Sequence, residues 1–164
     1  MESNLDPIAV LRTDNQVARE ALSDFVAWLG KISRAKTEEE KKGLLGHHKG
    51  IIQPLEKYVN VQFRVEEEGL FPVLGNYIGI QTGPIHVMLI EHNNSKELFN
   101  SFKNALSGNN YKEAASSGNS FAALLSEHIE KEDHILLNMA DMHLTVEEKA
   151  VVLKKIREIS KTIN

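Results

Sequence analysis

The chain has 164 residues, enough for one domain with a sizeable buried core. It has no cysteine, which excludes disulfide bonds, thiolate metal sites, cysteine nucleophiles and iron–sulfur clusters with their usual ligands. Its formal net charge is −4, with lysines and glutamates interspersed, so no basic patch for nucleic acid is expected. The N-terminus is unlike a signal peptide, and no apolar run approaches the about 18 residues of a membrane span. We therefore expect a soluble, cytoplasmic protein that binds neither nucleic acid nor a membrane.

Helical periodicity runs through nearly the whole sequence, and the strict alternation typical of strands is almost absent. The pattern predicts an all-α protein, an up-down four-helix bundle over about residues 6–142 followed by a C-terminal fifth helix over about 145–162. Neither a solenoid repeat nor a long linker divides the chain, so we expect residues 1–164 to form a single domain.

The first two helices are bounded by capping signals. Asp6-Pro7 begins a helix that should end near Ala35, because proline is tolerated in a first turn. Thr37 and Glu40 predict a capping box for a second helix that ends near Leu74, with a kink or break between residues 50 and 54 before Pro54. The expected buried stripes are Ile8, Leu11, Asn15, Ala18, Leu22, Phe25 and Leu29, then Leu55, Val59, Gln62, Glu66, Leu70 and Val73.

The third helix should begin at Gly83-Pro84 and end at Ser107, and the fourth should run from about Tyr111 to Ala140. A capping box at Thr145 and Glu148 begins the fifth helix, which we expect across one end of the bundle. The expected buried positions are Ile85, Met88, Leu89, His92, Phe99, Phe102 and Leu106, then Phe121, Leu124, Leu125, His128, Glu132, Ile135 and Met139, and finally Val151, Leu153, Ile156 and Ile159.

Polar residues interrupt these stripes on all four helices of the bundle. A buried histidine or carboxylate must be hydrogen-bonded, paired or metal-bound, because burying it alone costs several kcal/mol. Each of these polar residues alone could be an ordinary hydrogen-bonded core residue. All of them together favour a metal site with nitrogen and oxygen ligands. The residues are Asn15, Gln62, Glu66, His92, His128 and Glu132.

Three sequence segments resemble a known family. Glu66-Glu67-x-x-Leu70-Phe71-Pro72, Gly83-Pro84-Ile85 with Glu91-His92, and His128-Ile129 with Lys131-Glu132 are similar to the hemerythrin-like, HHE-type cation-binding domain, and the similarity covers about residues 6 to 142. The resemblance implies a four-helix bundle that holds two irons, bridged by two carboxylates and bound by histidines.

Carried over residue by residue, the resemblance makes Glu66 and Glu132 the bridging carboxylates, and His92 and His128 ligands of one iron. Asn15 and Gln62 stand where the family has histidines of the other iron. An amide oxygen is a poor ligand for a transition metal, so we expect one strong metal position beside a weak or vacant one. The two amides are expected to hydrogen-bond to each other and to a bridging carboxylate. Iron is the expected metal, in one or two ions, with zinc or manganese as substitutes.

Three acidic residues, Asp14, Glu67 and Asp133, neighbour these positions; they either orient a histidine through its second nitrogen or are solvated charges. The remaining histidines fall away from the ligand faces and are expected at the surface or behind the site: His47, His48, His86, His134 and His143.

Three functions remain open at the sequence level. The leading one is a metal-binding protein for sensing, binding or storage related to oxygen, nitric oxide or iron, with a small diatomic molecule as a possible ligand. The second is a metal-dependent oxidase or peroxidase. The third is a metal-free structural or interaction bundle, although two carboxylates without a cation would repel each other.

Overall fold

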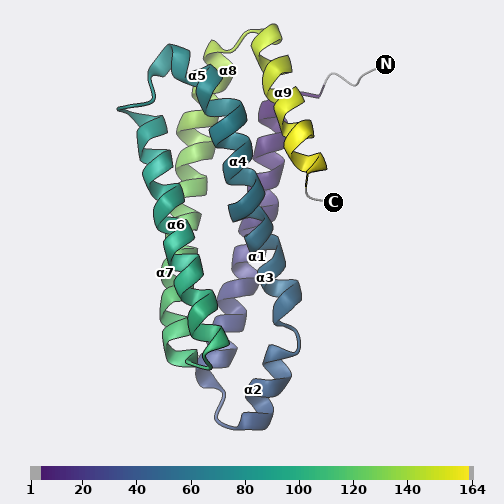
Figure 1. Cartoon of the computed structure of the whole chain (residues 1–164), viewed down its shortest axis with the longest axis vertical. Coiled ribbons are helices and arrows are strands. Elements are labelled where there is room, and N and C mark those ends of the chain that lie inside the picture. The colour runs from purple at the N-terminus through teal and green to yellow at the C-terminus, as the bar shows by residue number, and fades with distance from the viewer. Residues whose placement is uncertain (1–4, 163–164) are drawn as a thin grey trace.

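The computed structural model describes residues 5–162, and within them four long rods form an elongated bundle (Figure 1). The first rod is α1, Pro7–Arg34, which begins as expected because the Asp6 carboxylate accepts a hydrogen bond from the Ile8 amide at 3.0 Å. The third rod is α6, Pro84–Ser107. The expected bundle of helices is confirmed.

The second rod is assembled from several segments. A short α2, Glu38–Leu45, is followed by α3, His48–Lys57, and the rod continues without interruption through η1, Tyr58–Gln62, α4, Phe63–Val65, η2, Glu66–Leu70, and α5, Phe71–Ile78. The segments η1 and η2 are single turns of π-helix.

The fourth rod consists of α7, Tyr111–Lys131, a third π-helical turn η3, Glu132–Leu136, and α8, Leu137–His143. The last helix, α9, Val146–Lys161, packs against α1, α4 and η2. It lies along the side of one half of the bundle (Figure 1), so its expected place across one end is wrong.

The apolar core is divided into two clusters. One contains Phe25, Trp28, Phe99, Phe102 and Phe121, and the other gathers aliphatic residues such as Leu11, Leu70, Leu74, Ile85 and Leu136 with α9. On every rod the polar positions of the sequence lie between residues of the two clusters. A buried polar layer therefore crosses the bundle between two apolar halves.

Several expectations about helix boundaries are wrong. The break in the second rod lies at Gly46–His47 and not at residues 50–54, and Pro54 stands inside α3. The rod also continues past Leu74 to Ile78. At Thr37 only half of the capping box forms, because the Glu40 carboxylate accepts its hydrogen bond from the Lys36 amide.

Two expected core positions are also wrong. Ile135 is 46% exposed, because the π-helical turn η3 adds a residue to the turn and places Leu136 and Leu137 in the core instead. Val151 on α9 is 57% exposed and its neighbour Val152 is buried. Among the described residues, 5–162, no helix is long and apolar enough to cross a membrane.

Candidate metal centre

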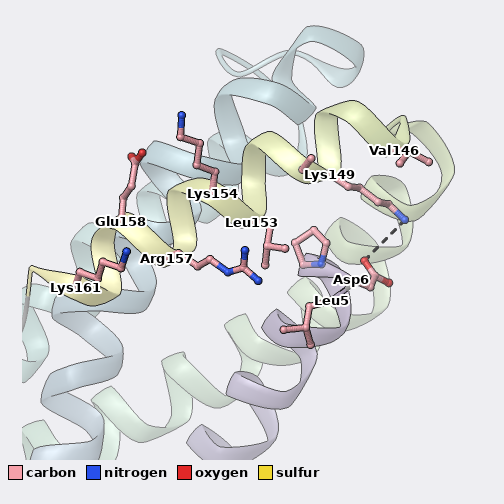
Figure 2. Close-up of a pocket in the computed structure, with 11 residues that line it drawn as sticks. Leu5, Asp6, Val146, Lys149, Leu153, Lys154, Arg157, Glu158 and Lys161 are labelled. Carbon is pink, nitrogen blue, oxygen red and sulfur yellow. Dashed lines mark ion pairs between the residues drawn. The ribbon is translucent and has the colours of Figure 1, made fainter. Parts of the chain in front are cut away.

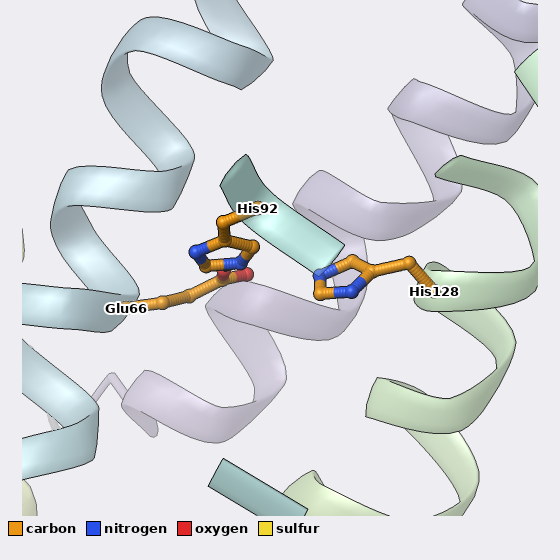
Figure 3. A group of neighbouring side chains, drawn as sticks. All are labelled: Glu66, His92 and His128. Carbon is orange, nitrogen blue, oxygen red and sulfur yellow. The ribbon is translucent and has the colours of Figure 1, made fainter. Parts of the chain in front are cut away.

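Three side chains from three different rods meet in the polar layer. Glu66 comes from η2, His92 from α6 and His128 from α7, and their rings and carboxylate point toward one another (Figure 3). All three residues are fully buried, and one nitrogen or oxygen atom of each lies within 4.8 Å of the others. This is a spacing at which one cation can contact all three.

The π-helical turns lie at the backbone positions that carry the site. Gln62 ends η1, Glu66 begins η2 and Glu132 begins η3, and in each turn an amide hydrogen-bonds to the carbonyl five residues earlier. Single π-helical turns inside α-helices often occur at functional sites because they change the direction of side chains locally. The sequence periodicity gave no signal for them.

Buried polar atoms without a hydrogen-bond partner concentrate at this centre. Of eight such atoms in the described chain, only Ser95 Oγ lies on a residue outside the six polar positions singled out in the sequence. The other seven are Gln62 Nε2, both carboxylate oxygens of Glu66, His92 Nε2, both ring nitrogens of His128 and Glu132 Oε2. Leaving a buried polar atom unpaired costs about 1–3 kcal/mol, so such a cluster requires an explanation.

The contact between His92 and Glu66 is an example of buried polar atoms that lie close together without a hydrogen bond. His92 Nε2 lies 2.8 Å from Glu66 Oε2, but the two atoms do not have the geometry of a hydrogen bond. A nitrogen and an oxygen this close are suited to binding the same cation. The residues therefore fit a metal ion bound by nitrogen and oxygen.

His92 is held in place on its other side. Its Nδ1 lies 2.7 Å from the Glu67 carboxylate, and its ring stacks on Phe63 with centroids 3.8 Å apart. The hydrogen bond with His92 lowers the pKa of Glu67, although partial burial opposes this. A carboxylate on the second nitrogen is the arrangement by which metal-binding histidines are usually oriented. The contact between Glu67 and His92 has this arrangement.

A carboxylate that the sequence did not predict also lies near His128, at a longer distance than Glu67 from His92. His128 Nδ1 lies 3.8 Å from Glu91, which also pairs with Lys131 at 3.3 Å. Burial disfavours the charge of Glu91, but His128 and Lys131 outweigh it and lower the pKa of this carboxyl. Glu91 was visible beside His92 in the sequence, but which rod it faces depends on packing between α6 and α7.

Glu132 completes the layer from η3. Its Oε2 lies 3.6 Å from His128 Nε2, and its side chain is fully buried. Burial raises the pKa of Glu132 well above its usual value, and the neighbouring charge of Glu66 raises it further. Burial likewise raises the pKa of Glu66 to about 8. Two carboxyl groups in this environment cannot both be charged at low cost without a cation.

The two amide positions are buried, but they do not contact each other as expected. Asn15 Nδ2 donates to Glu132 Oε1 at 3.3 Å, as expected for a carboxylate partner, whereas Asn15 Oδ1 accepts from the Tyr58 hydroxyl at 2.6 Å. Gln62 Nε2 has no partner. The expected Asn15–Gln62 hydrogen bond is wrong because Tyr58, one helical turn before Gln62, reaches Asn15 first.

The other acidic neighbours do not contact a histidine of the centre. Asp133 accepts from Asn15 Nδ2 at 2.8 Å and pairs with Arg19. Asp14 is partly buried, which raises its pKa, and Lys57 moderates the effect. The five remaining histidines lie at or near the surface, as expected; the side chain of His134, for example, is 74% exposed.

A wide groove of about 800 Å³ lies away from this centre, between α9 and the start of α1 (Figure 2). It is lined by Leu5, Asp6, Leu153 and several basic side chains including Lys149 and Arg157. None of the residues of the polar layer lines it.

A four-helix bundle with imidazoles and carboxylates gathered in its core defines the class of bundle proteins that bind cations. Comparison with known families agrees: residues 6–140 match the hemerythrin HHE cation-binding domain. The chain belongs to the hemerythrin family. No protein with a curated description is similar enough to count as a match.

Proposed function

We propose that this protein binds one transition-metal ion per chain through Glu66, His92, His128 and Glu132. The observation that supports this most strongly is the cluster of seven unpaired, buried nitrogen and oxygen atoms. A cation would satisfy several of them together and would remove the conflict between the two buried carboxyl groups.

Iron is the metal we propose first. Two imidazoles with a carboxylate are a donor set typical of non-haem Fe(II), and both zinc and manganese accept the same kinds of ligand. Bound iron would supply an open coordination position. We propose a role in sensing, binding or storage related to oxygen, nitric oxide or iron, with a single ion in place of the family's two.

The chain's own residues would prepare the centre for the ion. Glu67 would fix the ring of His92 so that Nε2 faces Glu66. The Glu91 carboxylate lies 3.8 Å from the second nitrogen of His128, too far for a hydrogen bond. The two apolar clusters pack on either side of the layer. A metal-free interaction bundle is the alternative, and in it a proton would have to relieve the repulsion between Glu66 and Glu132.

Substitution of the histidines tests this proposal. His92→Ala and His128→Ala should each abolish tight binding of zinc or iron, as measured by elemental analysis after loading and desalting. His47→Ala and His143→Ala are matched controls because both side chains are exposed, and each should retain the metal. Equal loss of metal in all four variants would show that binding is nonspecific or lies elsewhere.

A further inference from the structure

Asn15 is fully buried, and both ends of its amide are hydrogen-bonded. Its oxygen accepts from the Tyr58 hydroxyl at 2.6 Å, and its nitrogen donates to Asp133 Oδ1 at 2.8 Å and to Glu132 Oε1 at 3.3 Å. An amide nitrogen carries two N–H donors, so two carboxylate oxygens match its capacity. These partners fix the orientation of the amide, because a flipped amide would turn its oxygen toward the carboxylates.

The orientation matters because an amide nitrogen has no lone pair available for a cation. The side that Asn15 turns toward Glu132 consists of N–H groups, which exclude a metal from that side of the layer. The amide thus occupies the half of the centre in which the sequence departs from the family.

The network that holds Asn15 is anchored on three rods. Asp133, on η3, accepts a hydrogen bond from Arg19 of α1, and Arg19 also pairs with Glu130 at 2.9 Å. Arg12 donates to the backbone carbonyl of Asp133 at 2.8 Å. The rings of Tyr58 and Phe63 contact each other edge to face, with centroids 5.7 Å apart. The amide therefore has little freedom to rotate.

We infer that Asn15 and Tyr58 are positioning residues that make the centre a one-metal site. The inference rests on the proposed function above. Asn15 donates to Glu132 Oε1, so Oε2 is the oxygen that has no hydrogen-bond partner and would be free to bind an ion. Glu132 would then hold an ion through Oε2, while the Asn15 amide beside Oε1 disfavours a second ion at that oxygen. The pair replaces the second metal position with hydrogen bonds of the protein itself.

Cobalt(II) is a suitable probe, because its visible absorption reports the number and arrangement of its ligands. The wild type, Asn15→Leu and Tyr58→Phe should be loaded with Co²⁺, and their spectra, stoichiometry and dissociation constants compared. Leucine fills a similar volume without donors, and Tyr58→Phe keeps the ring packed on Phe63, so at least one variant should remain folded. Tyr77→Phe is the matched control, since the exposed Tyr77 hydroxyl bonds to Glu148 away from the centre.

We expect Asn15→Leu to change the cobalt spectrum, because Glu132 gains a second free oxygen, and to weaken binding about tenfold or more. Tyr58→Phe should move the spectrum in the same direction by a smaller amount, and Tyr77→Phe should leave it unchanged. Folded Asn15→Leu and Tyr58→Phe proteins with the wild-type spectrum and affinity would overturn the role of Asn15 and Tyr58 while leaving the proposed function intact. Wild-type protein that takes up no cobalt would instead contradict the proposed function itself.

Discussion

Residues that surround the centre affect the orientation and the basicity of the side chains in it. Glu67 on the back of His92 has the clearest geometry, with a single 2.7 Å contact to Nδ1. Its carboxylate favours the tautomer in which Nε2 carries the lone pair, and it increases the basicity of the imidazole. The next residue, Glu68, pairs with Arg64 on the surface.

Glu67→Gln should therefore weaken metal binding without unfolding the protein. Loss of such a partner typically costs about 10- to 100-fold in metal affinity, and we expect the lower end because glutamine can still accept a hydrogen bond. Glu68→Gln is the matched control and should bind metal as the wild type does. Competition with a coloured chelator measures both constants, and equal affinities for the two variants would contradict the role given to Glu67.

At the residue scale, the sequence identified the positions that share a helix face but not the pairs that cross between rods. Glu66, His92, His128 and Glu132 were predicted to lie in the core from their spacing, and all four are buried. Tyr58 lies one turn before Gln62, so helical spacing in the sequence predicts that the two residues share a face. That its hydroxyl reaches Asn15 on another rod depends on how closely α1 and η1 approach each other.

At the scale of elements, the rods are regular except where they carry the centre. Helix boundaries that depend on proline, glycine or a capping side chain were predictable within a few residues, as at Asp6-Pro7 and Ser107. The π-helical turns were not, because they result from packing and from side chains that must reach the same point. The error at Ile135 follows directly from η3.

The polar segment around Ser116 to Ser120 shows how packing supports an intrinsically poor helix. Gly118 lies where α7 approaches α1 and α6 closely: an added Cβ would lie 2.7 Å from Leu29 Cδ1 and 3.2 Å from Phe102 Cδ2. Glycine weakens an isolated helix, but here it permits the close contact of the rods.

Gly118→Val should lower the free energy of unfolding by about 1–3 kcal/mol, the usual cost of overfilling a packed core. Ser116→Ala, on the exposed face of the same segment, should leave stability unchanged or raise it slightly. Urea denaturation of the three proteins measures the difference. An increase in stability for Gly118→Val would show that α7 is free to move away from α1.

At the scale of the whole molecule, the polar layer links metal binding to the stability of the bundle. A ligand present at a hundred times its dissociation constant stabilises the folded state by about 2.7 kcal/mol. Without the ion, Glu66 and Glu132 have raised pKa values, so the folded protein binds protons more tightly than the unfolded chain does.

The metal-free protein should therefore lose stability as pH rises from about 4.5, the usual range of a glutamate, through about 8, the pKa of Glu66 in the fold. The metal-bound protein should keep its stability near neutral pH, because the cation stabilises the charged carboxylates. The gap between their melting temperatures should narrow as pH falls from 8 toward 5.5, where protons also compete for the histidines. Parallel melting curves test this, and a gap that widens on acidification would contradict the electrostatic account.

We expect that the fold of a two-metal family holds one ion in this chain. Elemental analysis of the wild type after loading with excess zinc or iron and desalting tests it most directly, beside a variant that carries both Asn15→His and Gln62→His. We expect close to one ion per chain in the wild type and a rise toward two in the double variant, because the added imidazoles restore the missing ligands. Two tightly held ions in the wild type would contradict the claim.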